Sequence, residues 1–296
     1  MKQRKIKTPL PLRIIASTYP IVEAVAPWLA KRWFVKIFFS TAKYKFPHGE
    51  IEAAEMATAY NISYESKKVQ VYEWGDGKPV LMVHGWMGRG TQFRKFIQTF
   101  NEAGYKVVAF DAPGHGKSDG GSSHILKFAD VIAQLSERYN GFEMIIGHSL
   151  GGVATMHAII RGVATNKLVM ISSPAIADEI MSEFRKKIGA TELAMPYFNN
   201  HIEQMFGCSF EGFSAKQNIH LIKDIDLLLI YDQDDREVSL DSPKVLMAKH
   251  DNAKLIRTSG LGHTRILKDD FVVESTLKHL QSEKEISSKD PVLIRN

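Results

Sequence analysis

The sequence predicts an α/β protein with a mostly parallel central sheet covered by helices on both faces. From residue 69 onward, short β-branched and apolar runs alternate with longer segments of helical periodicity, the pattern of strand–helix–strand units. A glycine-rich turn, Gly147-His148-Ser149-Leu150-Gly151, falls between an apolar run and a helical segment. The length of 296 residues suits one large domain with a sizeable core. We place this domain over residues 68–281.

The expected elements follow one another regularly through that domain. Strands are expected over residues 69–74, 80–84, 106–110, 143–146, 167–171, 227–231 and 254–258. Helices are expected over about 92–103, 122–139 and 271–280, with a small-residue helix directly after Ser149. Residues 174–223 interrupt the alternation with no strand pattern. Because this stretch is too long for a plain connection, we expect helices in it and a small cap over the functional site.

The two ends of the chain differ from the domain between them. Residues 1–67 are predicted to be a basic, apolar-rich helical segment, and residues 282–296 a polar C-terminal tail. Residues 1–45 hold ten Lys and Arg against Glu23 alone, about +9, whereas the whole chain carries +5, so the remainder is near −4. Such asymmetry can indicate a nucleic-acid or an anionic-membrane contact. No nucleic-acid-binding module is recognisable, so we expect no nucleic-acid partner and favour a membrane surface.

Two interpretations of residues 10–39 remain open. In the first, an interfacial amphipathic helix turns Trp28, Trp33, Phe34 and Phe38 toward lipid and its cations toward headgroups. In the second, which is the commoner arrangement, the same residues pack as helices on the flank of the domain. Charges interrupt the stretch before it reaches the roughly 20 apolar residues that span a bilayer, and no clean signal-peptide cleavage site follows the basic start. The expected location is cytoplasmic, peripheral to the membrane if the first interpretation holds.

Composition excludes several classes of protein. With 44% hydrophobic and 24% charged residues and no low-complexity tract, the chain is an ordinary globular one. Cys208 is the only cysteine, which rules out an internal disulfide framework and any Cys-based zinc site. We expect neither a metal nor an organic cofactor, because the reaction inferred below needs none. The oligomeric state does not follow from the sequence.

Ser149 is the predicted nucleophile, because G-x-S-x-G between a strand and a helix places a serine on a sharp, strained turn. A serine hydroxyl is a poor nucleophile at neutral pH and needs a base, for which an imidazole is suited. His263, in a glycine-rich loop after the last strand, is the predicted base; His84, His115 and His148 are weaker candidates. A carboxylate should orient the imidazole, and Asp232, Asp234 and Asp235 all lie in the loop after the strand at 227–231.

An oxyanion hole requires two backbone N–H groups directed at the developing negative charge. Leu150, directly after the predicted nucleophile, supplies one N–H. The second is expected from Trp86, in the His84-Gly85-Trp86-Met87-Gly88 loop that follows a strand.

These segments together resemble the α/β-hydrolase superfamily over roughly residues 68–281. His84-Gly85-Trp86 is similar to its oxyanion strand, and residues 111–118, DAPGHGKS, to its D-x-P-G-H-G-x-S loop. The resemblance implies an α/β-hydrolase fold with a nucleophile elbow. If Val238 is aligned with the valine of the G-x-x-D-x-x-V pattern, the triad acid is Asp235; because Asp232 occupies the usual glycine, Asp234 remains an alternative.

The resemblance also implies a reaction class. A serine nucleophile in the Gly-His-Ser-Leu-Gly-Gly form is typical of esterases, lipases and thioesterases, whereas related dehalogenases and epoxide hydrolases carry aspartate there. The expected activity is hydrolysis of a small-molecule carboxylic ester (EC 3.1.1 type) through an acyl-serine. Alternatives are a thioesterase, a C–C bond hydrolase or a non-catalytic ligand-binding protein. Apolar residues of the insert either line a substrate pocket or form the core of the cap: Met181, Phe184, Met195, Tyr197, Phe198, Met205 and Phe206.

Overall fold

The computed structural model describes residues 10–282 and 293–294. The chain divides into two compact units. One, here called the sheet unit, comprises Thr41–Ala175 and Ser214–Asn296. The other, the helical unit, comprises Met1–Ser40 and Ile176–Phe213, so its second segment is inserted between two strands of the sheet unit.

The sheet unit is built on a nine-stranded, mostly parallel sheet in the order β1-β2-β4-β3-β5-β6-β7-β8-β9. The strands are β1 (Thr58–Tyr64), β2 (Lys67–Trp74), β3 (Lys78–Val83), β4 (Tyr105–Phe110), β5 (Met144–His148), β6 (Lys167–Ile171), β7 (Asp226–Asp232), β8 (Lys254–Thr258) and β9 (Leu293–Ile294). Only the pairs β1–β2 and β2–β4 are antiparallel. The predicted α/β class and the seven predicted strands are confirmed.

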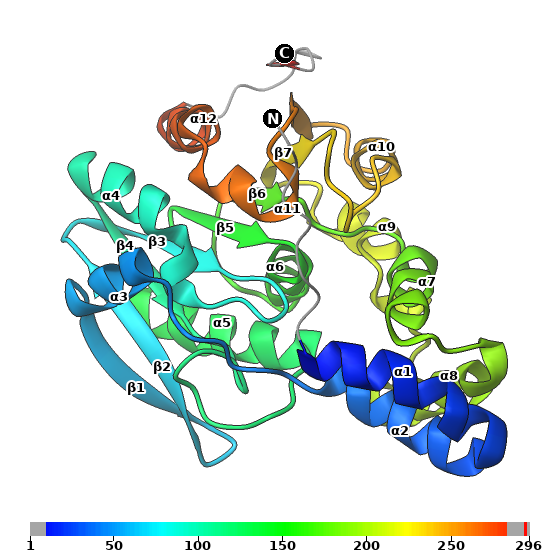
Figure 1. Cartoon of the computed structure of the whole chain (residues 1–296). Coiled ribbons are helices and arrows are strands. Elements are labelled where there is room, and N and C mark those ends of the chain that lie inside the picture. Colours follow the sequence, from blue (N-terminus) through cyan, green and yellow to red (C-terminus); the bar gives the residue numbers. More distant parts are fainter. Residues whose placement is uncertain (1–9, 283–292, 295–296) are drawn as a thin grey trace. The chain divides into compact units, whose positions relative to one another are not determined.

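Helices cover both faces of this sheet, because its central strands are apolar on both sides. Even-numbered Val80 and Met82 of β3 belong to a core with α4 (Arg94–Glu102) and α12 (Asp270–Gln281). Odd-numbered Leu81 and Val83 belong to a second core with α5 (Ile125–Tyr139) and α6 (Leu150–Ile160). Figure 1 shows the two helix pairs on opposite sides of the sheet. The shorter helices are α3 (His48–Glu55), α9 (Ala215–Asn218), α10 (Asp241–Met247) and α11 (Gly262–Arg265), with 3₁₀ turns η1 (Gly90–Phe93), η4 (Ile219–Ile222) and η5 (Ile266–Lys268).

The prediction of a helical segment over residues 1–67 is wrong for its last part. Residues 58–64 form β1, which pairs with β2 from Thr58↔Glu73 to Tyr64↔Lys67. The turn between these strands places Glu65 and Ser66 at positive φ. In β1, Tyr60, Ile62 and Tyr64 pack against the second core and alternate with exposed Asn61 and Ser63. This is the period-two pattern of a half-buried strand, which the prediction of one helical segment did not use. Residues 41–57 also belong to the sheet unit.

Among its described residues, the helical unit contains four longer helices and two short turns. They are α1 (Leu10–Val25), α2 (Pro27–Phe39), α7 (Ala177–Ile188) and α8 (Met195–Phe206), with the 3₁₀ turns η2 (Glu192–Ala194) and η3 (Glu211–Phe213). The N-terminal helices and the insert share one core, in which Phe34 meets Phe184 edge-on at 5.2 Å. Of the predicted 174–223 insert, residues 176–213 belong to this unit, whereas α9 and η4 belong to the sheet unit.

This core corrects one detail of the amphipathic interpretation. Phe34 is fully buried, and Phe38 lies edge-on against Phe184 and Phe198 within the unit. Neither ring faces outward. Most of the apolar residues singled out in the insert also belong to this core or pack against it, and only Tyr197 and Met205 are exposed.

Within the described residues, no helix is both long and apolar enough to cross a membrane. Most of the predicted tail, residues 283–292 and 295–296, lies outside the described residues. Leu293 and Ile294, which fall within the predicted polar tail, pair with Ile256 and Arg257 of β8.

Candidate active site

Ser149 occupies a sharp turn between β5 and α6. Its backbone has φ 53° and ψ −125°, a conformation that costs a non-glycine residue about 1–3 kcal/mol and is concentrated at functional sites. The Ser149 N–H donates to the carbonyl of Ile171 at 2.8 Å. As the first helical residue, Leu150 has an N–H without an intrahelical acceptor. The turn therefore presents a hydroxyl beside the positive end of a helix.

Two glycines make this turn sterically possible. A Cβ on Gly147 would lie 2.4 Å from the Cα and N of Gly152, and a Cβ on Gly151 would lie 2.3 Å from the Val83 carbonyl oxygen. In both cases the opposing atoms are backbone, which cannot rotate away. The G-x-S-x-G spacing is therefore a packing requirement of the elbow.

Gly147→Ala is expected to cost about 3 kcal/mol or more of stability, or to abolish folding, because backbone must move to admit the methyl group. Gly121→Ala is the matched control, since a Cβ there meets nothing within 4 Å. Urea unfolding of both variants measures the difference. Equal midpoints for the two variants would refute the steric account.

His263 lies in α11 and pairs with a carboxylate from the loop after β7. Its Nδ1 is 2.8 Å from Asp235 Oδ2, and the side chains of His263 and Asp235 are 10% and 0% exposed. Asp235 Oδ1 also accepts the N–H groups of Glu237 and Val238. Burial acts to raise the pKa of Asp235, but the hydrogen bond and charge of His263 and the Glu237 N–H together lower it. Asp235 is thus a buried carboxylate kept ionised against His263.

Neighbouring Asp234 and Asp232 have other contacts. Asp234 Oδ2 accepts the N–H of Gly260 at 2.7 Å. Asp232 is fully buried and accepts the N–H groups of Leu261 and Gly262 at 3.2 and 2.8 Å. The sequence analysis named Asp232 as one of three candidate acids and as a departure from the usual glycine of the acid loop. Its position at the end of a buried strand was the available signal that it orders the histidine loop.

His148 connects the elbow directly to the histidine loop. Its Nε2–H donates to the His263 carbonyl oxygen at 2.8 Å, and the two rings lie 4.7 Å apart. Gln92 Nε2 is 3.5 Å from His148 Nδ1, which therefore serves as the acceptor. The residue before Ser149 thus holds His263 close to the elbow, a positioning role that the sequence did not reveal.

The loop from His84 to Gly88 lies against Ser149. A Cβ on Gly85 would be 2.7 Å from Ser149 Cβ. The Gly85 carbonyl accepts from His84 Nδ1 at 2.7 Å and from the Gly88 N–H at 3.0 Å. In a trans peptide the N–H of the next residue points opposite to that carbonyl, so the Trp86 N–H points away from His84.

Asp111 anchors the segment that follows the loop of residues 84–88. Its carboxylate accepts the N–H groups of Gly90 and Lys117 at 2.8 and 2.7 Å and the Tyr72 hydroxyl at 3.0 Å. Burial raises the pKa of Asp111. The D-x-P-G-H-G-x-S segment therefore acts as a scaffold, linking β4 to the loop that carries Trp86.

Three histidines around the site are buried and held uncharged. Burial lowers the pKa of His84 well below its usual value, that of His115 to about 4, and that of His148 to about 3, the last with a contribution from the nearby His263. Unfolded histidines bind protons near pH 6.5. The unfolded chain therefore holds more protons below that pH, and stability is complete above about pH 6.5 and lost as the pH falls toward 4.

His115→Gln is expected to flatten this acid dependence by up to about 1.4 kcal/mol per pH unit between about pH 6 and pH 4.5. The measurement is the free energy of unfolding in urea at a series of pH values. His48→Asn is the control, since that side chain is 87% exposed. An unchanged slope in His115→Gln would show that this histidine titrates normally.

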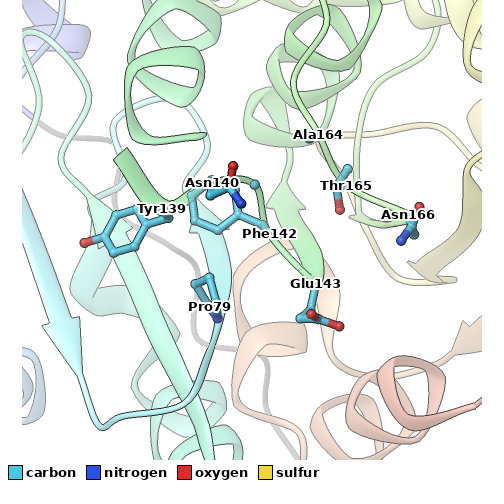
Figure 2. A pocket seen from close by; sticks show the side chains of 9 residues that line it. Pro79, Tyr139, Asn140, Phe142, Glu143, Ala164, Thr165 and Asn166 are labelled. Atoms are coloured by element: carbon cyan, nitrogen blue, oxygen red, sulfur yellow. The ribbon is translucent and has the colours of Figure 1, made fainter. Parts of the chain in front are cut away.

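A surface cavity of about 260 Å³ lies at the amino ends of the parallel strands, away from Ser149 and His263. Figure 2 shows it between Pro79, Glu143 and Asn166, which stand at or just before the amino ends of β3, β5 and β6. Ser149 and His263 follow the carboxyl ends of their strands, where ligands bind in open α/β sheets. This cavity is therefore not part of the site.

Among the described residues, no cluster of three or more His, Cys, Asp or Glu side chains is placed to hold a metal ion.

The fold and this arrangement define an α/β-hydrolase. The sequence profile of the serine aminopeptidase S33 family matches residues 77–236, a little over half of the chain. The chain belongs to this family within the α/β-hydrolase superfamily. The superfamily resemblance drawn from the sequence is thereby confirmed.

Two curated relatives and one solved structure illustrate the likeness. The chain is 30% identical over 166 residues to a non-heme chloroperoxidase of Streptomyces lividans, and 31% identical over 161 residues to the pimeloyl-[acyl-carrier protein] methyl ester esterase of Vibrio cholerae. Each match covers 50% of this chain and spans 60% of the relative. The solved esterase EaEST of Exiguobacterium antarcticum shares the fold, with TM-score 0.59, 18% identity and coverage of 73% of this chain and 96% of its own.

Proposed function

We propose that this protein hydrolyses carboxylic esters through an acyl-serine intermediate. Ser149 is the nucleophile, His263 the general base and Asp235 the acid that orients it. The N–H groups of Trp86 and Leu150 form the oxyanion hole. The observation that carries the proposal is the 2.8 Å contact between His263 Nδ1 and the buried Asp235. The same histidine is hydrogen-bonded through its carbonyl to His148, the residue before Ser149.

The chemistry follows from this arrangement. Asp235 accepts a hydrogen bond from the Nδ1–H of His263. This fixes the tautomer whose Nε2 is free to take the proton of the Ser149 hydroxyl as its oxygen attacks the ester carbonyl. The developing oxyanion is stabilised by the Trp86 and Leu150 N–H groups, each typically worth about 100- to 1000-fold in rate. The imidazolium then protonates the leaving alcohol. Water, activated by the same imidazole, releases the acid and restores Ser149.

The names of relatives support the choice of bond. One relative of similar sequence is a methyl ester esterase, and a solved structure of the same fold is an esterase. We infer only the bond class, a carboxylic ester.

Hydrolysis of p-nitrophenyl esters of increasing acyl length by the purified chain tests this function, with acyl thioesters of the same lengths in parallel. Preference for the oxygen esters is the expected result. A fluorophosphonate probe, followed by peptide mass spectrometry, should label Ser149. Preference for thioesters would change the bond class, whereas no turnover together with no labelling would overturn the catalytic proposal.

A further inference from the structure

Large apolar side chains lie exposed where α1 passes into α2. Ile21 and Val25, near the end of α1, are 62% and 76% exposed, and Trp28 and Leu29, at the start of α2, are 66% and 44% exposed. Ile21 and Val25 are four residues apart and so share one helix face. Exposed apolar residues are ordinary when scattered singly, whereas a contiguous group marks an interaction surface.

The same two helices are well packed on their other side. Tyr19 and Phe34 are fully buried in the core of the helical unit, and Ala30 is nearly so. The exposed group is therefore not a loosely folded end of the chain. It is the outer face of two helices whose inner side is packed in a core.

The exposed charged side chains of α1 and α2 are basic. Arg32 and Lys36 are exposed and lie four and eight residues after Trp28, on the same side of α2. Glu23, the only acid in residues 1–45, is instead buried and accepts the N–H of Thr191 at 3.0 Å. Within α1 and α2, the outer face thus combines exposed apolar side chains with cations and carries no exposed carboxylate.

We propose that this surface, Ile21, Val25, Trp28, Leu29, Arg32 and Lys36, docks the protein on a bilayer that contains anionic lipid. Tryptophan is enriched at the membrane interface, where its ring is half apolar and half polar. Apolar side chains enter the headgroup boundary while neighbouring Lys and Arg attract anionic headgroups. The proposal is independent of the catalytic one, because binding is measured without turnover.

Vesicle co-sedimentation of the full chain tests the surface. Wild type should bind vesicles of phosphatidylcholine with phosphatidylglycerol more tightly than phosphatidylcholine alone. Val25→Ser combined with Trp28→Ser should weaken binding at least about tenfold through lost apolar burial. Met56→Ser is the control, since Met56 is an 80% exposed apolar residue of the sheet unit, and it should leave binding unchanged.

A charge variant separates the two contributions. Arg32→Glu combined with Lys36→Glu should weaken binding to the anionic vesicles about tenfold or more and leave binding to phosphatidylcholine alone unchanged. Circular dichroism confirms that each variant is folded. Wild type that binds neither vesicle, or binding that persists in the Val25→Ser, Trp28→Ser variant, overturns the proposal. Self-association that this variant abolishes, without any vesicle binding, would assign the surface to a second copy of the chain.

Discussion

Ser149→Ala is expected to lower kcat for ester hydrolysis by about 10⁶-fold, the scale on which removal of a triad serine acts. The acyl intermediate requires an oxygen nucleophile, and alanine leaves His263 with no proton to accept. Alanine adopts the positive φ of this position at a cost similar to that of serine, so the fold should be retained. The measurement is kcat for the preferred p-nitrophenyl ester, together with fluorophosphonate labelling, which should disappear.

Ser63→Ala is the matched control for this experiment. Ser63 is an exposed residue of β1 and should react with neither substrate nor probe. A Ser149→Ala variant that keeps more than about one hundredth of wild-type turnover would mean that another residue carries the reaction.

Asp235→Asn is expected to lower kcat by about 10⁴-fold without unfolding the protein. The asparagine amide can donate to His263 Nδ1, which stabilises the tautomer that carries its proton on Nε2. That tautomer cannot accept the proton of Ser149. KM should change little, because Asp235 holds the base and does not contact substrate in the proposed mechanism.

Asp234→Asn separates this account from the alternative acid. The asparagine carbonyl oxygen can still accept the Gly260 N–H that Asp234 accepts, so turnover should fall by no more than about threefold. A larger loss in Asp234→Asn than in Asp235→Asn would exchange the two roles.

Much of the sheet unit could be predicted from the sequence, because buried parallel strands appear as apolar runs. The serine turn could also be predicted, because nearby backbone atoms leave no room for a Cβ at positions 147 and 151. Both positions therefore appear in the sequence as glycine. The edge strand β1 was missed although Tyr60, Ile62 and Tyr64 alternate with polar residues, because this short alternation follows a longer stretch of helical character and was included in it. The union of residues 1–40 with 176–213 was missed as well, since the core they share joins segments far apart in the chain.

The sequence by itself determined the α/β fold, the serine turn and the order in which Ser149, the acid loop and His263 follow one another. These properties depend on local periodicity and on glycines at fixed spacing. Only the tertiary structure decided which carboxylate meets His263. Asp234 and Asp235 are adjacent in the chain, but the side chain of Asp234 contacts Gly260 and that of Asp235 contacts His263. It also decided the roles of Asp232 and His148, whose partners lie about 30 and 115 residues away. Contacts at such separations depend on how strands are paired, which periodicity alone does not specify.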